Sequence, residues 1–383
     1  MKVCMLSIAD AGQPYGSTTR PMFLGNHLVR LGINVIHICE KLHTDGQGPR
    51  IISRQDFPNE SEKMASRHLI QHCRQFSPDL VYSHQVYPAK LGRKLSRSLK
   101  RIHVYDAHSS LAQELSIYAH VPARERLWRV AYEWVTLLFS DRIIAPSVEL
   151  RDYFVRIYHI RPEKIRIVKN GVETRTFKPG RPDPLLKQSL GIPSDATVVL
   201  FTNPRIDTFP SNEMALRMLF RLIPEIERKI ANVRFLILGG GTQIAAPSRN
   251  VIYTGYVNNL PAYLNLADVC VGPYPPEAVC GGTRNKICEY LACGKPIVAT
   301  SEAMRGFDDA IDGEHFLLAG DEMDFVAKLQ ECIQQPGRAS ALGRNARQLS
   351  EKYDWNHLAG EVVAVFEEAA RDRKSPILGK NTL

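Results

Sequence analysis

The sequence predicts an α/β protein of two domains, each built from parallel strands that alternate with helices. A chain of 383 residues is long for one domain and suits two of about 150 to 200 residues each. Apolar strand segments recur along the chain with helical segments between them, which is the pattern of βαβ units. A segment rich in Pro and charged residues, 173–195, marks the predicted boundary.

The composition is that of an ordinary globular chain, with 44% hydrophobic and 23% charged residues. The chain has no apolar run of about 18 residues, so we expect no transmembrane helix. The segment Met1–Ile8 is interpreted as a first strand and not as a signal peptide. The eight Cys form no Cys-x-x-Cys pair, which argues against a zinc site or a disulfide framework and favours buried thiols in a reducing cytoplasm.

Charge is distributed unevenly along the chain. Residues 1–180 hold 27 Lys and Arg against 16 Asp and Glu, a surplus of 11, whereas residues 181–383 hold 22 against 24. The basic first half therefore favours an anionic partner.

The stretch 267–300 carries the strongest functional signal. Residues 268–272 and 297–300 are predicted as short buried strands. Between them, a Pro-rich loop leads into a helix that ends at Gly294.

The start of that helix suits an anion. Gly281 and Gly282 let the backbone approach a ligand closely, and the free N–H groups of a helix N-terminus favour negative charge. Arg284 and Lys286 stand where the helix dipole disfavours cations, which indicates an anionic partner. Glu289 lies one turn further on the face of Lys286, so a diphosphate and a neighbouring ribose hydroxyl are both within reach. An ordinary strand-loop-helix unit with solvated charges is the alternative.

Residues 289–298, Glu-Tyr-Leu-Ala-Cys-Gly-Lys-Pro-Ile-Val, match the second half of a known donor-site signature. The chain thereby resembles the retaining glycosyltransferases of family 4, whose GT-B fold has two facing Rossmann-like domains with an interdomain cleft. By this resemblance Glu289 binds the nucleotide ribose and Lys286 holds the pyrophosphate. The first Glu of the signature would stand at position 281, where this chain has Gly281. We therefore expect Glu277, the only acidic residue of the Pro-rich loop, to supply the carboxylate that touches the donor sugar.

The resemblance also implies a division of labour and a reaction. We predict an acceptor-binding domain over 1–175, a nucleotide-sugar-binding domain over 176–355, and a C-terminal helix with its tail, 356–383, that crosses back to the first domain. The implied reaction moves a hexosyl group from a UDP- or GDP-sugar to a glycan or lipid-linked acceptor, in cell-surface polysaccharide or glycolipid synthesis. No cofactor, metal ion or nucleic acid is expected. The alternatives are a nucleotide-sugar 2-epimerase, which shares the fold, and a non-catalytic nucleotide-binding protein.

Two predicted strands, 78–84 and 102–108, each end in His. Side chains just past the carboxyl ends of parallel strands point into a ligand crevice. The segment around His108 resembles the family segment in which a His contacts the donor sugar, which favours His108 over His84. Asp106 and Glu114 are weaker candidates.

Three more candidates come from loops of the resembled fold. Gly16 lies in the first loop, Arg205 at the place of a pyrophosphate-binding Arg, and Val257 in the segment whose backbone reads the nucleobase. The candidate catalytic residues are thus His108, Arg284 and Lys286, and the candidate substrate-binding residues are Gly16, Arg205, Val257, Glu277, Gly281, Gly282, Thr283 and Glu289.

A predicted basic helix suggests where the protein works. Residues 90–101 place Lys and Arg on one side and Leu91, Leu95 and Leu99 on the other, which suits an anionic phospholipid surface. The segment 124–139 extends that surface in this interpretation, and a solvated helix face is the alternative. We expect a cytoplasmic protein, with peripheral binding to the inner face of the cell membrane as the specific hypothesis.

Overall fold

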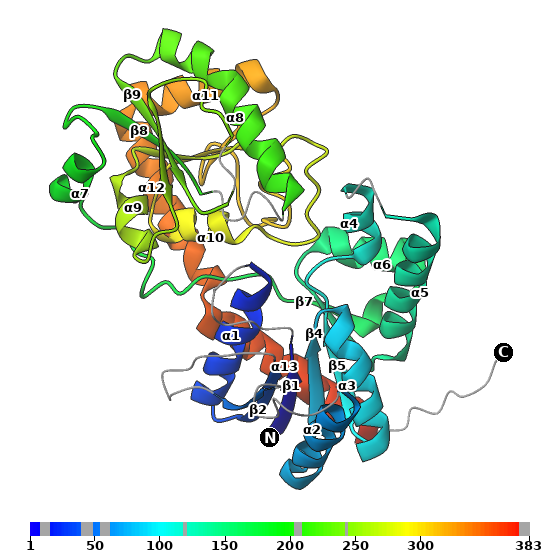
Figure 1. The fold of residues 1–383 in the computed structure, drawn as a ribbon. Helices are drawn as coiled ribbons and strands as arrows, with labels where there is room; N and C mark the ends of the chain where they lie inside the picture. Colours follow the sequence, from blue (N-terminus) through cyan, green and yellow to red (C-terminus); the bar gives the residue numbers. More distant parts are fainter. Residues whose placement is uncertain are drawn as a thin grey trace. The chain divides into compact units, whose positions relative to one another are not determined.

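The computed structural model describes residues 1–7, 16–39, 49–53, 62–117, 121–202, 209–241 and 244–374. The chain divides into two compact units (Figure 1). The first comprises Met1–Ala112, Val121–Lys169 and Trp355–Leu383, and the second comprises Gln113–His120 and Asn170–Asp354.

The first unit is built on a seven-stranded sheet in the order β3-β2-β1-β4-β5-β6-β7. All neighbouring strands pair in parallel. The strands are β1 (Lys2–Leu6), β2 (Asn34–Cys39), β3 (Arg50–Ser53), β4 (Leu80–His84), β5 (Ile102–Asp106), β6 (Arg142–Ala145) and β7 (Ile165–Ile167).

Helices cover both faces of this sheet. They are α1 (Gly16–Arg30), α2 (Glu62–Phe76), α3 (Val86–Leu99), α5 (Ala123–Phe139), α6 (Val148–Tyr158) and α13 (Trp355–Lys374), with the short 3-10 helix Pro162–Lys164 and with α4 (Leu111–Ile117) at the border of the unit. Val3 of β1 packs in a cluster with α1 and α13, whereas the next residue, Cys4, packs in a second cluster with α2 and α3. This alternation follows from the two-residue period of a strand.

The second unit repeats the plan with six parallel strands in the order β10-β9-β8-β11-β12-β13. The strands are β8 (Thr197–Thr202), β9 (Val233–Leu238), β10 (Val251–Gly255), β11 (Val269–Gly272), β12 (Ile297–Thr300) and β13 (Leu317–Ala319). The helices are α7 (Pro184–Ser189), α8 (Pro210–Lys229), α9 (Leu260–Leu266), α10 (Asn285–Ala292), α11 (Glu322–Gln334) and α12 (Pro336–Ser350), followed by the 3-10 helix Glu351–Tyr353.

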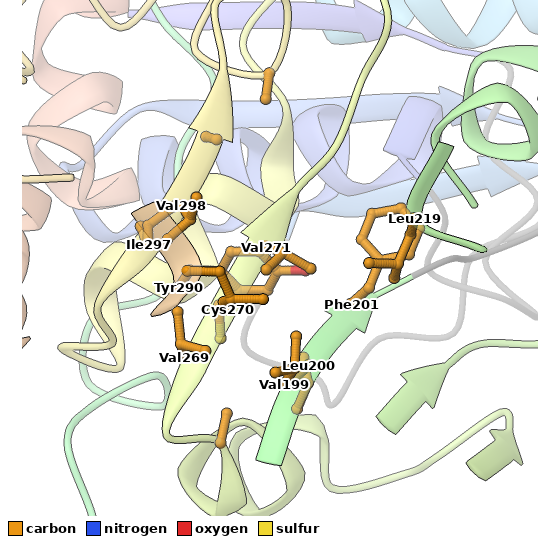
Figure 2. Packing of buried hydrophobic residues seen from close by; sticks show 14 of the residues in the cluster. Val199, Leu200, Phe201, Leu219, Val269, Cys270, Val271, Tyr290, Ile297 and Val298 are labelled. Carbon is orange, nitrogen blue, oxygen red and sulfur yellow. The ribbon is translucent and has the colours of Figure 1, made fainter. Parts of the chain in front are cut away.

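The centre of the second unit is a buried apolar cluster. Figure 2 shows side chains of β8, β11 and β12 packed together with Tyr290 of α10. The central strands β8 and β11 are buried over almost their whole length, so they appear in the sequence as continuous apolar runs. The buried Tyr290 hydroxyl oxygen accepts a hydrogen bond of 2.8 Å from the backbone N–H of Thr202.

The α/β class predicted from the sequence is confirmed. Apolar runs in the sequence predict strands over 34–39, 197–202, 233–238 and 297–300, and β2, β8, β9 and β12 have these bounds. The sequence also predicts a strand over 314–318, and this prediction is wrong at its start. Residues 312–316 form a turn in which Gly313 has φ +76°, and β13 begins only at Leu317. A left-handed residue at this place suits Gly and interrupts extended backbone.

The predicted Leu stripe of the basic helix is also corrected. Leu95 is fully buried, and Leu91 and Leu99 pack against the same core cluster as α2. These side chains hold α3 to its sheet and are not free for a lipid surface. No helix within the described ranges is both long and apolar enough to cross a membrane.

All eight Cys are free thiols, and seven of them are buried. The Sγ atoms of Cys4 and Cys73 lie 3.0 Å apart in the first unit. Burial raises the pKa of Cys270 and of Cys293, the latter to about 12. These two thiols therefore stay protonated.

Candidate functional site

The sheet order of the second unit marks a ligand position. The chain runs outward from β8 through β9 to β10, then returns to β11 beside β8 and runs outward the other way. In open parallel sheets, ligands bind at the carboxyl ends of the two strands where the direction reverses. Here these strands end at Thr202 and Gly272.

The loop after β11 and the helix α10 belong to this carboxyl edge. Ile287 and Leu291 are fully buried and fix the apolar face of α10, as the helical spacing predicts. Gly294 ends the helix with φ +63°, which a side chain would disfavour. The first turn of α10 is thereby held beside the end of β8.

Lys286 lies in that first turn and is buried. Its Nζ donates hydrogen bonds to the carbonyl oxygen of Thr202 and, at 3.2 Å, to Oδ1 of Asn212. The ammonium also lies 4.5 Å from the centroid of the Phe201 ring. Burial, followed by the charge of Arg284, holds the pKa of Lys286 well below its usual range. A bound anion would restore the preference for the charged form.

Glu289 is the carboxylate on the same face, three residues after Lys286. It is half-buried and makes no hydrogen bond or ion pair with any residue that the structure describes. Burial raises its pKa to about 7, against the opposing effect of the Lys286 charge. A carboxylate of this kind can accept hydrogen bonds from ligand hydroxyl groups.

The sequence predicts that Arg284 and Lys286 together bind an anion. In the structure the Arg284 guanidinium already has protein partners. It donates to the carbonyl oxygen of Ala278 and to Oε1 of Glu302 at 3.2 Å, and it lies 3.5 Å from the Tyr274 ring centroid. Both members of the Arg284–Glu302 ion pair are buried. Arg284 therefore ties the loop 273–284 to the segment after β12.

The neighbouring loop residues have mixed roles. Gly282 and Thr283 are buried, and Gly281 is half-buried. Thr283 Oγ1 accepts a 3.0 Å hydrogen bond from the backbone N–H of Asn170, and its carbonyl oxygen accepts a 2.9 Å bond from Asn170 Nδ2. Thr283 thus anchors the loop to the segment at Asn170.

The remaining candidates of the second unit lie further out. Glu277 is exposed at the tip of the Pro-rich segment, and Val257 is half-exposed just after β10. Arg205 lies outside the described residues.

Two polar residues that the sequence interpretation missed complete the arrangement. Asn212 of α8 joins Lys286 to the Tyr274 hydroxyl, which donates to Asn212 Oδ1 at 2.9 Å. Glu302 accepts from the backbone N–H of Cys280 at 3.1 Å and pairs with Arg305. Glu302 could have been found from its position just after the end of the predicted strand 297–300.

The first unit gathers a second polar cluster at the carboxyl ends of β4 and β5. Asp106 is fully buried, and its carboxylate accepts hydrogen bonds from Arg20 Nε, at 3.0 Å, and from the Tyr82 hydroxyl. His84 Nδ1 lies 3.1 Å from His108 Nε2 and 3.6 Å from Asp106 Oδ2. The two strand-end His thus lie side by side, a contact that the sequence did not predict.

Both His of this cluster are neutral near pH 7. Burial lowers the pKa of His108 to about 4 and holds the pKa of His84 well below its usual range. Gly16, the candidate from the first loop, is the first residue of α1, the helix that supplies Arg20.

Two family models of glycosyltransferases match this chain. A model described as Glycosyltransferase Family 4 matches residues 16–176, and one described as Glycosyl transferases group 1 matches residues 198–335. Among relatives, the D-inositol 3-phosphate glycosyltransferase of Acidothermus cellulolyticus is 25% identical over 319 residues, covering 78% of this chain and 68% of its own length. The enzyme of that name from Kineococcus radiotolerans is 26% identical, covering 77% of this chain and 72% of its own length.

Solved structures show the same fold. A sucrose-phosphate synthase from Thermosynechococcus elongatus superimposes with a TM-score of 0.75 and 18% identity, covering 97% of this chain and 99% of its own. HepE from Anabaena, solved with UDP and glucose, gives a TM-score of 0.74 and 18% identity, covering 96% of this chain and 100% of its own. The resemblance found in the sequence is confirmed, and the chain belongs to the family 4 glycosyltransferases, with a fold of the GT-B type.

Proposed function

We propose that this glycosyltransferase moves a hexosyl group from a UDP- or GDP-sugar to a glycan or lipid-linked acceptor, in the synthesis of a cell-surface polysaccharide or glycolipid. The observation that carries the donor side is the pair formed by Lys286 and Glu289. One turn of α10 presents an ammonium and, beside it, a carboxylate without a hydrogen-bond partner among the described residues. A nucleoside diphosphate requires these two groups, one for its phosphates and one for its ribose hydroxyls.

Two solved relatives of the fold support the choice of donor and pathway. HepE from Anabaena has been solved with UDP and with UDP-glucose. WaaG, with a TM-score of 0.68, is described as a glycosyltransferase involved in lipopolysaccharide biosynthesis. The curated relatives are named D-inositol 3-phosphate glycosyltransferases, which supports glycosyl transfer as the reaction class.

In the proposed mechanism Lys286 stabilises the leaving diphosphate. Negative charge grows on the diphosphate as the bond to the sugar breaks, and a cation held beside the diphosphate stabilises that charge. Lys286 would exchange its bonds to Thr202 and Asn212 for phosphate oxygens. We propose that the transfer retains anomeric configuration and uses no metal ion, as the family resemblance implies.

Arg284 enters this mechanism as a positioning residue. Its ion pair with Glu302 fixes the loop that precedes α10, and its charge lowers the pKa of Lys286. Because Glu302 already neutralises Arg284, we assign the diphosphate to Lys286 and to the backbone N–H groups of Gly282 and Thr283.

On the sugar side we propose Glu277 and His108. Glu277 is exposed and is the only carboxylate of the Pro-rich loop, where the family Glu at position 281 is replaced by Gly281. A lost hydrogen bond between a carboxylate and a sugar hydroxyl costs about 1.5 to 3 kcal/mol. Unchanged donor kinetics in Glu277→Ala would remove Glu277 from the site.

We further propose that the protein works at the cytoplasmic face of a membrane, bound through α3 and α5. Lys90, Lys94 and Arg97 of α3 are exposed. The neighbouring helix α5 exposes large apolar side chains instead of burying them, namely Leu127, Trp128, Trp134, Leu138 and Phe139. Trp and Phe beside basic residues are typical of a helix that lies in the headgroup region.

The donor assignment is tested by a thermal-shift screen with UDP, GDP, ADP and dTDP and with their sugars. A ligand at about 100 times its Kd adds roughly 2.7 kcal/mol of apparent stability. We expect one nucleotide to raise Tm in the wild type and to raise it much less in Glu289→Ala. Absence of a shift with every nucleotide would contradict the donor site.

A further inference from the structure

The inference concerns the polar cluster under His108 and rests on the proposed role of that residue in sugar recognition. Asp106 is fully buried, and both of its oxygens are within hydrogen-bond distance of Arg20 Nε, at 3.0 and 3.1 Å. The Tyr82 hydroxyl donates to Oδ2 as well. Burial raises the pKa of Tyr82, so this hydroxyl keeps its proton and remains a donor.

His84 lies between this carboxylate and His108. Its Nδ1 is 3.6 Å from Asp106 Oδ2 and 3.1 Å from His108 Nε2, while its Nε2 is buried without a hydrogen-bond partner among the described residues. A neutral imidazole carries one proton, so the two nitrogens cannot both be donors.

The surroundings select the nitrogen that holds the proton. With the proton on Nε2, a buried N–H would have no acceptor, and the Nδ1 lone pair would face the Asp106 carboxylate. With the proton on Nδ1, the N–H points at His108 Nε2 and lies near the negative charge of Asp106. Buried N–H groups without an acceptor are rarer and costlier than unused lone pairs, so the second arrangement is favoured.

We propose that Asp106 and His84 fix the tautomer of His108, so that its ring accepts a hydrogen bond at Nε2 and presents its own proton at Nδ1. His108 Nδ1 makes no hydrogen bond with any described residue, although its ring is only half-exposed. The ring therefore offers a neutral hydrogen-bond donor to an oxygen of the bound sugar, and it does not serve as a general base through Nδ1. Asp106 and His84 act as positioning residues.

The same three side chains place possible metal-ligating atoms within 4.8 Å of one another. The buried guanidinium of Arg20 already neutralises Asp106. A second cation at this place would meet Arg20 at close range, so the cluster is better suited to a hydrogen-bond relay than to a metal ion.

The tautomer can be measured without any substrate. We would record two-bond 1H–15N spectra of the 15N-His-labelled full chain near pH 7, with His108 identified by its loss in His108→Gln. We expect the wild type to show the proton of His108 on Nδ1. In His84→Asn the side-chain N–H stands near the place of Nδ1 and should keep this pattern, whereas His84→Leu should shift it toward Nε2.

His103→Gln is the matched control. His103 is also a buried His, but it lies in β5 and is hydrogen-bonded to Ser83 and Ser140. This variant should leave the His108 spectrum unchanged. A proton on Nε2 of His108 in the folded wild type would overturn the proposal, even if His84→Leu does not fold. An unchanged spectrum in a folded His84→Leu would overturn it too.

Kinetics separate this proposal from the proposed function. We expect His84→Leu to lower kcat by about tenfold, with Kd for the nucleoside diphosphate unchanged and with activity largely restored in His84→Asn. The two proposals can fail separately. If His108 carries its proton on Nδ1 but the wild type transfers no sugar, the proposed tautomer stands and the proposed glycosyl transfer is contradicted.

Discussion

At the scale of single residues, Lys286 and Glu289 have different proposed roles toward the donor. Lys286 is bonded to a carbonyl oxygen at the carboxyl edge of the sheet, and in the proposed mechanism it stabilises the growing charge of the leaving group. We expect Lys286→Ala to lower turnover by about 100-fold or more at saturating donor. Steady-state kinetics with varied donor would measure this.

Lys295→Ala is the control for that substitution. Lys295 is also a buried Lys whose Nζ donates to two backbone carbonyl oxygens, of Asn265 and Ala267, but it precedes β12 and lies at the opposite edge of the sheet. This variant should lose stability and keep its turnover per folded molecule. Equal losses of turnover in the two variants would show that Lys286 acts only on the fold.

Glu289 should give nucleotide binding a dependence on pH. Its pKa is raised to about 7 by burial, so the group is mostly protonated at pH 6 and mostly ionised at pH 8. The ionised form accepts two hydroxyl hydrogen bonds, and the protonated form loses part of that capacity. Calorimetric titration should therefore show weaker nucleotide binding at pH 6 than at pH 8.

In Glu289→Gln the part of this dependence that comes from Glu289 should disappear, while the contributions of Lys286 and of the nucleotide phosphate remain. An identical pH dependence in wild type and variant would argue against contact between Glu289 and the ligand.

The sequence predicted that Lys286 and Glu289 lie one turn apart on one helix, because that spacing is local, and both residues belong to α10. It did not reveal that Arg284 is committed to Glu302, since that partner lies in another element. The Arg20–Asp106 pair spans 86 positions along the chain. Local patterns contain no information on such pairs, which only the folded sheets bring together.

At the scale of elements, strands were predicted well and the exposed faces of helices less well. Buried parallel strands are continuous apolar runs that end at turn residues, so 197–202 and 233–238 could be located directly. The Leu residues of α3 have the same spacing whether they face a membrane or a core, and the structure places them in the core. The apolar surface instead belongs to α5, which packs beside α3.

Contacts between the two helices join their surfaces. The guanidinium of Arg97 lies 4.8 Å from the ring centroid of Phe139, and Tyr87 stacks on Tyr132. We expect the protein to sediment with anionic vesicles and not with neutral ones, and we expect salt to reverse this, because charge attraction is screened within roughly 10 Å at 0.1 M salt.

Two sets of substitutions test this surface. Replacing Lys90, Lys94 and Arg97 with Glu should weaken vesicle binding by roughly 100-fold or more, since each basic residue contributes about 1 kcal/mol. Trp128→Ser with Trp134→Ser should also weaken it. Leu185→Ser, which changes an even more exposed apolar residue, in α7, should have no effect. Equal binding to both kinds of vesicle would contradict the proposed docking.

At the scale of the whole molecule, buried His make the first unit sensitive to acid. Burial lowers the pKa of His37 and of His103 to about 3 and that of His108 to about 4. Between these values and an unfolded pKa near 6.5, the unfolded chain binds more protons than the folded one. The free energy of unfolding therefore falls with falling pH, by roughly 1.4 kcal/mol per pH unit for each such His.

Trp fluorescence can follow the unfolding of the first unit alone, because the three Trp of the chain, Trp128, Trp134 and Trp355, all belong to this unit. We expect a lower urea midpoint at pH 5 than at pH 7, and a smaller difference in His103→Gln. The same midpoint at both values would show that these His do not remain neutral in the folded chain.

The proposed function is tested most directly by release of nucleoside diphosphate from a panel of nucleotide sugars, measured with and without glycan and lipid-linked acceptors. We expect one UDP- or GDP-sugar to release its diphosphate at a substantial rate only when an acceptor is present, with a glycosylated acceptor as the second product. The rate should fall by about 100-fold in Lys286→Ala. Conversion of the donor to its 2-epimer without any acceptor, or binding of the nucleotide without turnover of any sugar, would contradict glycosyl transfer by this chain.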